Sequence, residues 1–561
     1  MSLALSCGSS KTTSNQIISD QFQKIESKLR ISDLNTQPMG GKSKNLMYAD
    51  WTKKFINSPV IAQKIYLVDL NQDGFTDLVT LEEKYSSPRV HFFAPKVKKF
   101  VRSKLQIFPK GFKASFLYFD DFNKDGTVDV AAGQFFMNVQ YNVPPAQVLY
   151  GVKQNGSPRF QVSQNIAPVG LPHSSFLAID TNRDGSLEFL NTFWIGRKNG
   201  INQFYPPQFF SFRGNMVEVD ENKSEIYKNG SASWSTELCD INNDSLSDIL
   251  VANTSGHENY VLVAQEQSDG FISGHQKFEN IIKDENGRGL ILGNGNTLGY
   301  LCADLNNDDL LDLISYEEKR ELQDSLRDPV RIHFQQRITD KNYPFYSEVF
   351  PVGAKNYSIK SIIDFDYDND GDSDLLVSDS GYPPYSRLML FENQDGQFIN
   401  KSFKSGINRL NPSGVNVVDL DGDGVLEIIV GQSRVRSGKL SGEVKIFKLK
   451  SHQPAFRSVE IFLQGIESNV SGIGAIISLK TKQLTKKSIV NYMRGGPSVQ
   501  RARGIHFGLG KEKSADISIE WASKKLKPTK LRLEFAENET FKQISVCDDG
   551  RFFIGKLNCP I

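Results

Sequence analysis

The sequence predicts an all-β fold, in which a seven-bladed β-propeller with calcium-binding blade loops is followed by a small C-terminal β domain. Three observations lead to this prediction. An acidic nine-residue loop occurs seven times, apolar runs typical of strands flank the copies, and successive copies start 52 to 64 residues apart. Four antiparallel strands in an interval of this length form one propeller blade, and propellers of four to eight blades are known.

The clearest copy of the loop is Asp366–Asp374, which reads DYDNDGDSD. Carboxylates at positions 1, 3, 5 and 9, with a backbone carbonyl at position 7, are the oxygen ligands that a hard cation such as Ca²⁺ prefers. Gly371 at position 6 permits the sharp turn that such a loop needs. An apolar run, and not a helix, follows the loop, so the sequence predicts a calcium-type loop within a β structure.

All predicted metal ligands stand at positions 1, 3, 5 and 9 of the seven loops. They are Asp69, Asn71, Asp73 and Asp77; Asp121, Asn123, Asp125 and Asp129; Asp180, Asn182, Asp184 and Glu188; Asp240, Asn242, Asp244 and Asp248; Asp304, Asn306, Asp308 and Asp312; Asp366, Asp368, Asp370 and Asp374; and Asp419, Asp421, Asp423 and Glu427. One such loop alone would more often be a plain turn, because Asp, Asn and Gly also favour turns. Clustered carboxylates repeated in register instead favour structural Ca²⁺, up to seven ions.

Strand signals surround each loop. Residues 65–68 and 415–418 are apolar runs that precede a loop, and residues 249–251 and 375–377 are apolar runs that follow one. Two further strands follow in several units, for example 387–391 and 397–403 across the turn at 393–396. The inner strands are nearly continuous apolar runs, as expected where neighbouring blades bury both faces of a sheet.

These loops and strands resemble FG-GAP/VCBS repeats, the calcium-loop blades of integrin α-subunit propellers. The resemblance covers about residues 50–450, and Ser245 and Asp309 depart from it because they replace the glycine at position 6 of loops four and five. It implies that the ions are structural and that partners usually bind the rim opposite the calcium loops.

A second pattern begins at about Ala455, where the acidic loops end and Lys becomes frequent. Strands are predicted at 458–464, 475–480, 489–493, 503–509 and 517–521, with a final hairpin over 531–546. The glycine-rich motifs at 467–475, 494–496 and 506–510, with Ile519-Glu520-Trp521, resemble the ASPIC/UnbV domain, which follows FG-GAP blades in the cartilage acidic protein family. The basic cluster of this region, which we expect to be a solvated face and otherwise a site for a carboxylate or sugar acid, is Arg494, Gln500, Arg501, Arg503 and His506.

The predicted division is a tether over 1–58 with a short amphipathic helix at 16–31, the propeller over 59–452, and the C-terminal domain and tail over 453–561. The stretch before and after Cys7 resembles the end of a bacterial lipoprotein signal but is too short for a complete one, so a lipid anchor at Cys7 and a chance match remain alternatives. Cys239 and Cys302 are expected to be small apolar strand residues. Cys547 and Cys559 are either a staple of the C-terminus or inert thiols.

The charge of the chain is unevenly distributed. Residues 451–561 hold 18 Lys and Arg against 10 Asp and Glu, a net charge of +8, so the rest of the chain carries −7 of the total of +1. Basic residues are dispersed and do not form one stripe, which argues against a nucleic-acid partner. No apolar run has the ~18–20 residues of a transmembrane helix.

These features favour a calcium-stabilised scaffold that binds a protein or glycan partner through one propeller face. We expect an extracellular, cell-surface or periplasmic location, because extracellular calcium modules fill at about 10⁻⁴–10⁻³ M. The sequence shows no constellation of nucleophile, acid and base. The alternative function is a calcium-dependent polysaccharide lyase or hydrolase that uses the propeller funnel.

Overall fold

The computed structural model describes residues 46–555 except 83–84, 136–143, 155, 167–170, 199–200, 221–229, 267–271, 278–295, 320–329, 338–344, 351–356, 382–385, 408, 436 and 495–498. The predicted all-β fold is confirmed, since the helices of the described part are the single turns α3 (Thr52–Phe55) and α5 (Ser402–Ser405). None of the helices described is long and apolar enough to cross a membrane. The predicted helix at 16–31 and Cys7 lie outside the described residues.

Seven antiparallel groups of four strands carry the acidic loops, and in each group the loop joins the first strand to the second. In chain order the groups are β2 (Lys64–Val68), β3 (Asp77–Leu81), β4 (Arg89–Ala94) and β5 (Lys99–Arg102); β6 (Phe116–Asp120), β7 (Asp129–Gly133), β8 (Gln147–Gln154) and β9 (Ser157–Asn165); β10 (His173–Ile179), β11 (Glu188–Phe193), β14 (Gln208–Arg213) and β15 (Met216–Asp220); β16 (Ala232–Cys239), β17 (Asp248–Thr254), β18 (Tyr260–Glu266) and β19 (Ile272–Lys277); β20 (Thr297–Ala303), β21 (Asp312–Lys319), β22 (Val330–Gln335) and β23 (Phe345–Val349); β24 (Tyr357–Phe365), β25 (Asp374–Asp379), β26 (Leu388–Gln394) and β27 (Gln397–Asn400); and β28 (Pro412–Val418), β29 (Glu427–Gln432), β30 (Lys445–Leu449) and β1 (Tyr48–Asp50). A short hairpin, β12 (Gly196–Lys198) with β13 (Ile201–Gln203), is inserted between β11 and β14.

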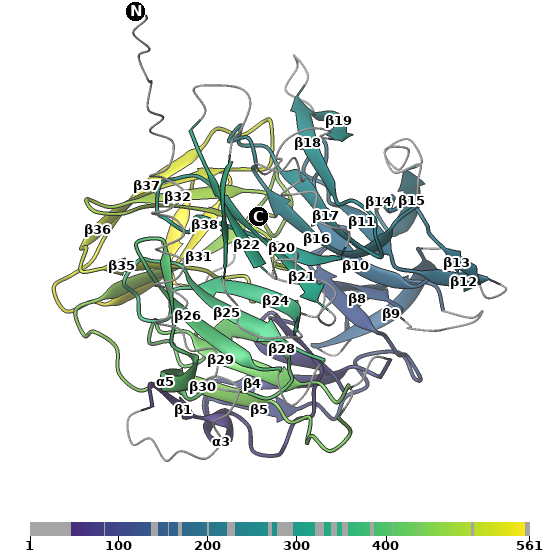
Figure 1. Cartoon of the computed structure of the whole chain (residues 1–561), viewed down its shortest axis with the longest axis horizontal. Coiled ribbons are helices and arrows are strands. Elements are labelled where there is room, and N and C mark those ends of the chain that lie inside the picture. The colour runs from purple at the N-terminus through teal and green to yellow at the C-terminus, as the bar shows by residue number, and fades with distance from the viewer. Residues whose placement is uncertain are drawn as a thin grey trace, which may run out of the picture.

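The first strands of these groups follow one another around a closed circuit. β2 contacts β6, β7 contacts β10, and the contacts continue through β16, β20, β24 and β28 back to β2. This is the arrangement of a β-propeller, in which the first strand of each blade lies innermost, and Figure 1 shows the sheets fanned around a centre. Large aromatic side chains such as Tyr66, Phe116, Phe119 and Phe176 are fully buried between neighbouring sheets.

The N-terminal strand corrects the predicted boundary of the tether at residue 58. β1 pairs with β30, with Tyr48 opposite Leu449 and Asp50 opposite Phe447. The last sheet is therefore completed by a strand that precedes the first one. The physical reason is that pairing the two ends of the chain satisfies the backbone groups of an edge strand and closes the ring.

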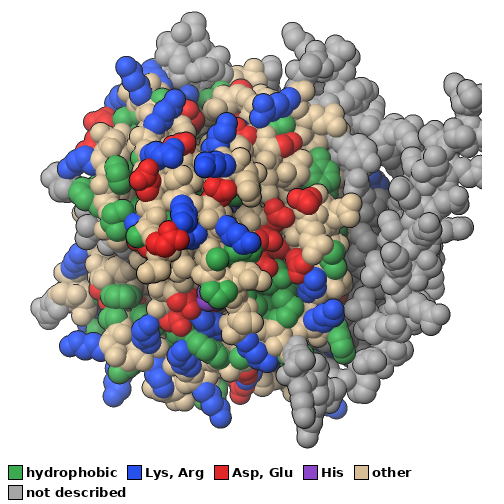
Figure 2. Space-filling view, turned by 90° about the vertical axis from the view of Figure 1, so that its left-hand side faces the viewer, with side chains coloured by type: hydrophobic (Ala, Val, Ile, Leu, Met, Phe, Trp, Pro, Cys, Tyr) green, Lys and Arg blue, Asp and Glu red, His purple; other side chains and the backbone are tan. Residues whose placement is uncertain are grey.

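The C-terminal domain consists of two four-stranded sheets. One holds β35 (Ile505–Gly510), β31 (Arg457–Gln464), β38 (Phe541–Cys547) and β39 (Phe552–Ile554), and the other holds β33 (Thr485–Ile489), β32 (Ile476–Lys480), β36 (Ser514–Glu520) and β37 (Thr529–Glu534). The predicted hairpin over 531–546 is wrong, because β37 pairs with β36 whereas β38 crosses to the other sheet and runs parallel to β31. Figure 2 shows basic and acidic side chains interspersed over the side of the molecule on which β36 lies in Figure 1.

A segment of this domain, described at residues 491–494 and 499–503, enters the centre of the ring. Its strand β34 (Val499–Gln500) pairs in parallel with the innermost strand β2. The Gln500 side chain hydrogen-bonds both backbone groups of Phe119 in β6, at 2.8 and 2.7 Å. Asn416 of β28 donates to the Gln500 carbonyl (2.8 Å), and Asn491 donates to Glu237 of β16 (2.6 Å). Contacts with inner strands on several sides of the ring place this segment, called here the central segment, on the propeller axis.

Cys239 and Cys302 are buried strand residues, as expected, but the expectation missed that they are paired with each other. They form a disulfide with a Cα–Cα distance of 5.6 Å. Cys239 ends β16, and Cys302 is the penultimate residue of β20, so the bond joins two neighbouring inner strands. Cys547 is also disulfide-bonded, and its partner lies outside the described residues. The bonds agree with an oxidising compartment.

Candidate metal centres and the domain that covers them

All predicted ligand residues lie in the seven loops, and these loops share one backbone geometry. In each loop the position-1 carboxylate accepts the backbone N–H groups of positions 5 and 6, at 2.7 to 3.2 Å. Position 6 has a positive φ in every loop, including Ser245 (65°) and Asp309 (68°). The two loops that lack the expected glycine therefore adopt the same turn, at the strain cost that a positive φ imposes on a non-glycine residue.

The position-9 carboxylates are held by backbone amides as well. In all seven loops this carboxylate accepts the N–H of position 2, at 2.7 to 3.0 Å. In loops one, two, four, five and six it also accepts an N–H from the third strand of the sheet, at 2.8 Å. These bonds fix the carboxylate at the base of the loop.

Burial and mutual repulsion perturb the pKa values of these carboxyl groups. Burial, with a smaller contribution from the neighbouring loop carboxylates, raises the pKa of Asp77 to about 7 and those of Asp129 and Asp312 to about 8. Burial likewise raises the pKa of Asp180 to about 8, with Glu188 as the next cause. Carboxylates in such surroundings are stabilised in their charged form by a cation.

Loop six fits a divalent cation best. Carboxylate oxygens of Asp366, Asp368 and Asp374 lie within 4.8 Å of one another. Asp368 Oδ1 is buried without a hydrogen-bond partner. A buried carboxylate oxygen without a donor is costly unless an ion binds it. These three residues would hold Ca²⁺, and the ion would supply charge balance and rigidity to the hairpin.

Loop seven has a second carboxylate cluster, formed by Asp419, Asp421 and Glu427. Here the Lys448 ammonium lies among the carboxylates, 2.7 Å from Asp421 Oδ1 and 2.5 Å from Glu427 Oε1. Loops one to five have Asn in place of the position-3 acid, which leaves fewer carboxylates in each. The structure thus brings together three acids in two of the seven predicted sites.

The C-terminal domain covers the end of the propeller that carries the loops. Lys124 of loop two donates to the Ser468 carbonyl (3.2 Å), and Gly510 N donates to the Asn369 carbonyl of loop six (2.9 Å). Lys487 N donates to Asp304 of loop five (3.0 Å). The two domains lie so close at Gly508 that no side chain fits there, because a Cβ at this position would stand 1.8 Å from Asp366 Oδ2.

The basic cluster of the C-terminal domain packs against the propeller, with Arg494 and Gln500 buried and Arg501, Arg503 and His506 half-buried, so its interpretation as a solvated face is wrong. Arg494 and Arg501 both bind Asp364 of β24 at 3.1 Å, and Arg503 binds Asp120 of β6 at 2.6 Å. Although burial alone would raise it, Arg494 and Arg501 hold the pKa of Asp364 below its usual value. The carboxylates that these arginines bind belong to the propeller itself. The local sequence around each arginine gives no sign of these distant partners.

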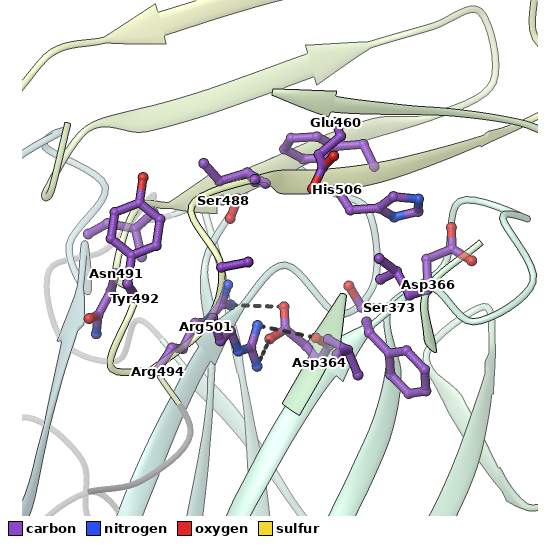
Figure 3. A pocket seen from close by; sticks show the side chains of 18 of the residues that line it. Asp364, Asp366, Ser373, Glu460, Ser488, Asn491, Tyr492, Arg494, Arg501 and His506 are labelled. Carbon is purple, nitrogen blue, oxygen red and sulfur yellow. Dashed lines mark hydrogen bonds and ion pairs between the residues drawn. The ribbon is translucent and has the colours of Figure 1, made fainter. Parts of the chain in front are cut away.

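A cavity of about 90 Å³ lies beside this ion cluster, between the central segment and the propeller. Figure 3 shows Arg494 and Arg501 together on one side of Asp364, with Glu460 and His506 across the cavity. Burial lowers the pKa of His506 to about 4, so its imidazole is neutral at neutral pH. The cavity is large enough for a few water molecules and too small for a sugar ring.

The opposite end of the propeller carries an aromatic cluster that the sequence analysis missed: Phe135, Trp194 and Trp234. Phe135 and Trp194 follow the ends of β7 and β11, and Trp234 lies near the start of β16, so all three are far from the loops. Their ring centroids are 5.6 to 5.8 Å apart, and each ring is half-buried. The Lys360 ammonium lies 4.9 Å from the centre of a Trp234 ring.

Irregularities in two inner strands place Trp234 and Lys360 there. The strand register shifts between Ser233 and Ser235 and between Ile359 and Ser361, which marks a β-bulge at each intervening residue. A bulge redirects a side chain, and bulges are frequent next to binding sites. The sequence signal for such a bulge is weak, because it depends on strand register.

Comparisons with known proteins identify two regions of the chain. The family model of the FG-GAP-like repeat matches residues 366–430, and that of ASPIC and UnbV matches residues 465–537. The chain therefore contains an FG-GAP-like repeat and a C-terminal ASPIC/UnbV domain, as its motifs indicated. A narrower relation to the cartilage acidic protein family stays a prediction. No curated protein matches the sequence.

Solved structures resemble the chain only distantly. Similar chains include one titled BBS1N in complex with ARL6DN (10% identity, TM-score 0.36), which covers 72% of this chain and 97% of that chain. Others are the exotype rhamnogalacturonan lyase YesX (12%, TM-score 0.28, covering 73% and 89%) and the Trypanosoma rangeli sialidase in complex with the inhibitor DANA (10%, TM-score 0.35, covering 66% and 60%). At these values the likeness carries no argument about function.

Proposed function

We propose that this chain is a calcium-stabilised β-propeller scaffold outside the cytoplasm that binds a glycan through the end of the propeller away from the C-terminal domain. One observation carries the proposal: the C-terminal domain covers the loop end, and its central segment lies on the propeller axis. The end that remains available carries the aromatic cluster Phe135, Trp194 and Trp234.

The chemistry of this end favours a glycan with acidic groups. Tryptophan rings offer flat apolar surfaces that pack against the C–H faces of sugar rings. Lys64 begins β2 and Lys360 lies in β24, so both enter the ring at the same end as the aromatic cluster. Ammonium groups beside a stacking surface suit a carboxylate-bearing sugar.

Calcium belongs to this proposal as a structural component. The fixed carboxylates and the orphaned Asp368 Oδ1 support ion binding, and the disulfide Cys239–Cys302 supports an oxidising compartment. The alternative of a lyase or hydrolase working in the propeller funnel is less well supported. Such an enzyme would bind its substrate in the centre of the ring. At the end of the propeller that carries the loops, this space holds the ion cluster of Arg494, Asp364 and Arg501.

The test is binding of the full chain to immobilised acidic and neutral polysaccharides, with about 1 mM Ca²⁺ present. We expect the double variant Trp194→Ala/Trp234→Ala to bind at least about tenfold more weakly, since each stacked ring contributes on the order of 1 kcal/mol. Phe552→Ala is the matched control, because Phe552 is an exposed aromatic residue of β39 in the C-terminal domain. Equal binding by the double variant and the wild type would contradict the proposal.

A further inference from the structure

Loop seven differs from the other loops in what lies against its carboxylates. The Lys448 ammonium is 2.7 Å from Asp421 Oδ1, 2.8 Å from Asp423 Oδ2 and 2.5 Å from Glu427 Oε1. A lysine ammonium has three N–H donors, and here each has a carboxylate acceptor. The Lys448 side chain is only 7% exposed and that of Glu427 is fully buried, so the ammonium lies in the folded interior, whereas Asp423 reaches it from the surface.

The position of Lys448 in its sheet explains why this happens in one loop. The register of β29 with β30 pairs Ile428 with Phe447, so Lys448, the next residue of the third strand, lies beside the position-9 residue Glu427. The registers of the other sheets place different residues at this point, none of them basic: Phe92, Tyr150, Ser211, Val263, Phe334 and Glu392. Loop six thus has a glutamate where loop seven has a lysine.

Two more lysines lie against loop seven. Lys98 donates to the Asp421 backbone carbonyl at 2.9 Å, and the Lys54 ammonium lies 3.9 Å from Asp421 Oδ2. Lys54 and Lys448 also lie over Trp51, at 3.4 and 5.3 Å from the ring centre. Trp51 follows β1, the strand that closes the ring, so these cations join loop seven to the closure of the propeller.

We propose that the Lys448 ammonium takes the place of the divalent cation in loop seven, so that this loop does not load Ca²⁺ when the other loops do. The proposal rests on the calcium-loop part of the proposed function. Three carboxylates that bind one ammonium group cannot also coordinate a metal ion at the same position. A divalent cation beside a buried ammonium would in addition be repelled by it. Loop seven closes the ring with a cation that is covalently part of the chain and that chelation cannot remove.

The test counts bound Ca²⁺ per full-length chain by native mass spectrometry. Lys448→Met removes the charge and keeps the length and apolar stem of the side chain, and Glu427→Gln removes a loop-seven carboxylate. We expect Lys448→Met to bind one more ion than the wild type, and Glu427→Gln to bind the same number as the wild type. A lower count in Glu427→Gln, or an unchanged count in a folded Lys448→Met, would overturn the proposal. Should Lys448→Met fail to fold, the Glu427→Gln count alone decides between these outcomes.

A loop-six variant separates this proposal from the calcium-loop proposal on which it rests. Asp368→Asn removes the position-3 carboxylate whose Oδ1 is buried without a donor. We expect it to bind one ion fewer than the wild type. An unchanged count in Asp368→Asn would contradict calcium binding by loop six, whereas the comparison of Glu427→Gln with the wild type would still report on loop seven.

Discussion

Neutralising Asp364 should loosen the C-terminal domain from the propeller. Asp364 lies in β24 and binds Arg494 and Arg501 of the central segment, at 3.1 Å each. The side chains of the three residues are between 6% and 14% exposed. Asp364→Asn keeps the shape of the side chain and leaves two buried guanidinium groups without a counter-charge.

The expected magnitude follows from this burial. Removing one partner of a buried ion pair costs about 3–5 kcal/mol, because the remaining charge is left desolvated and unpaired. That is a large fraction of the roughly 5–15 kcal/mol by which a typical domain is stable. The loss should fall on the docking of the central segment, since both arginines belong to it.

Two measurements check this expectation. Urea unfolding reports the change in the free energy of unfolding, and hydrogen exchange reports whether the amides of β34 lose protection first. The matched control is Arg532→Ala, which breaks the exposed ion pair with Asp516 in the C-terminal domain and should cost less than about 1 kcal/mol. An effect of Asp364→Asn no larger than that of the control would refute the reasoning.

Two further predictions concern the loops and the disulfide. In the presence of a chelator, the free energy of unfolding should fall by at least about 1 kcal/mol as the pH rises from 6 to 8. The reason is that carboxyl groups such as Asp77 and Asp129, whose raised pKa values are about 7 and 8, hold protons in the folded state over this range. The same groups are already deprotonated in the unfolded state, so raising the pH destabilises the fold. Saturating Ca²⁺ should abolish this slope, and thermal melts at both pH values check it; a slope that Ca²⁺ leaves unchanged would contradict ion binding at these carboxylates. The free energy of unfolding of the double variant Cys239→Ser/Cys302→Ser should be about 4 kcal/mol lower than that of the wild type, because the disulfide closes a loop of 63 residues. Urea titrations of the variant and of the oxidised and reduced wild type measure this difference. No difference between oxidised and reduced wild type would contradict that disulfide.

Features that recur along the chain could be predicted from the sequence. The spacing of the acidic loops located the first hairpin of each sheet, and position 6 adopts the same turn even at Ser245 and Asp309. The pairing of Cys239 with Cys302 was also present as a signal, because each cysteine stands one or two residues before the first carboxylate of successive loops. Neighbouring blades bring such equivalent positions close together, a consequence that residue-by-residue reasoning did not draw.

Features that depend on how distant parts of the chain dock could not be predicted in this way. Arg494, Arg501 and Arg503 have the composition of an exposed basic face, and only the entry of the central segment into the ring brings Asp364 and Asp120 to them. The boundary at residue 58 failed for a related reason, since β1 has its partner strand at the other end of the propeller. Local patterns carry no information about such partners.

On the proposal made for loop seven, one sequence motif serves two kinds of charge balance. The turns at positions 1, 5 and 6 are alike in loops six and seven, but the two loops differ at position 9, which is Asp374 or Glu427, and in the third-strand residue beside it, Glu392 or Lys448. A glutamate there adds negative charge near loop six, whereas a lysine supplies the cation of loop seven. The nine-residue motif alone therefore does not determine how many ions the ring binds. The residue opposite position 9 must be read together with the motif, because it decides whether the carboxylates face a metal ion or an ammonium group.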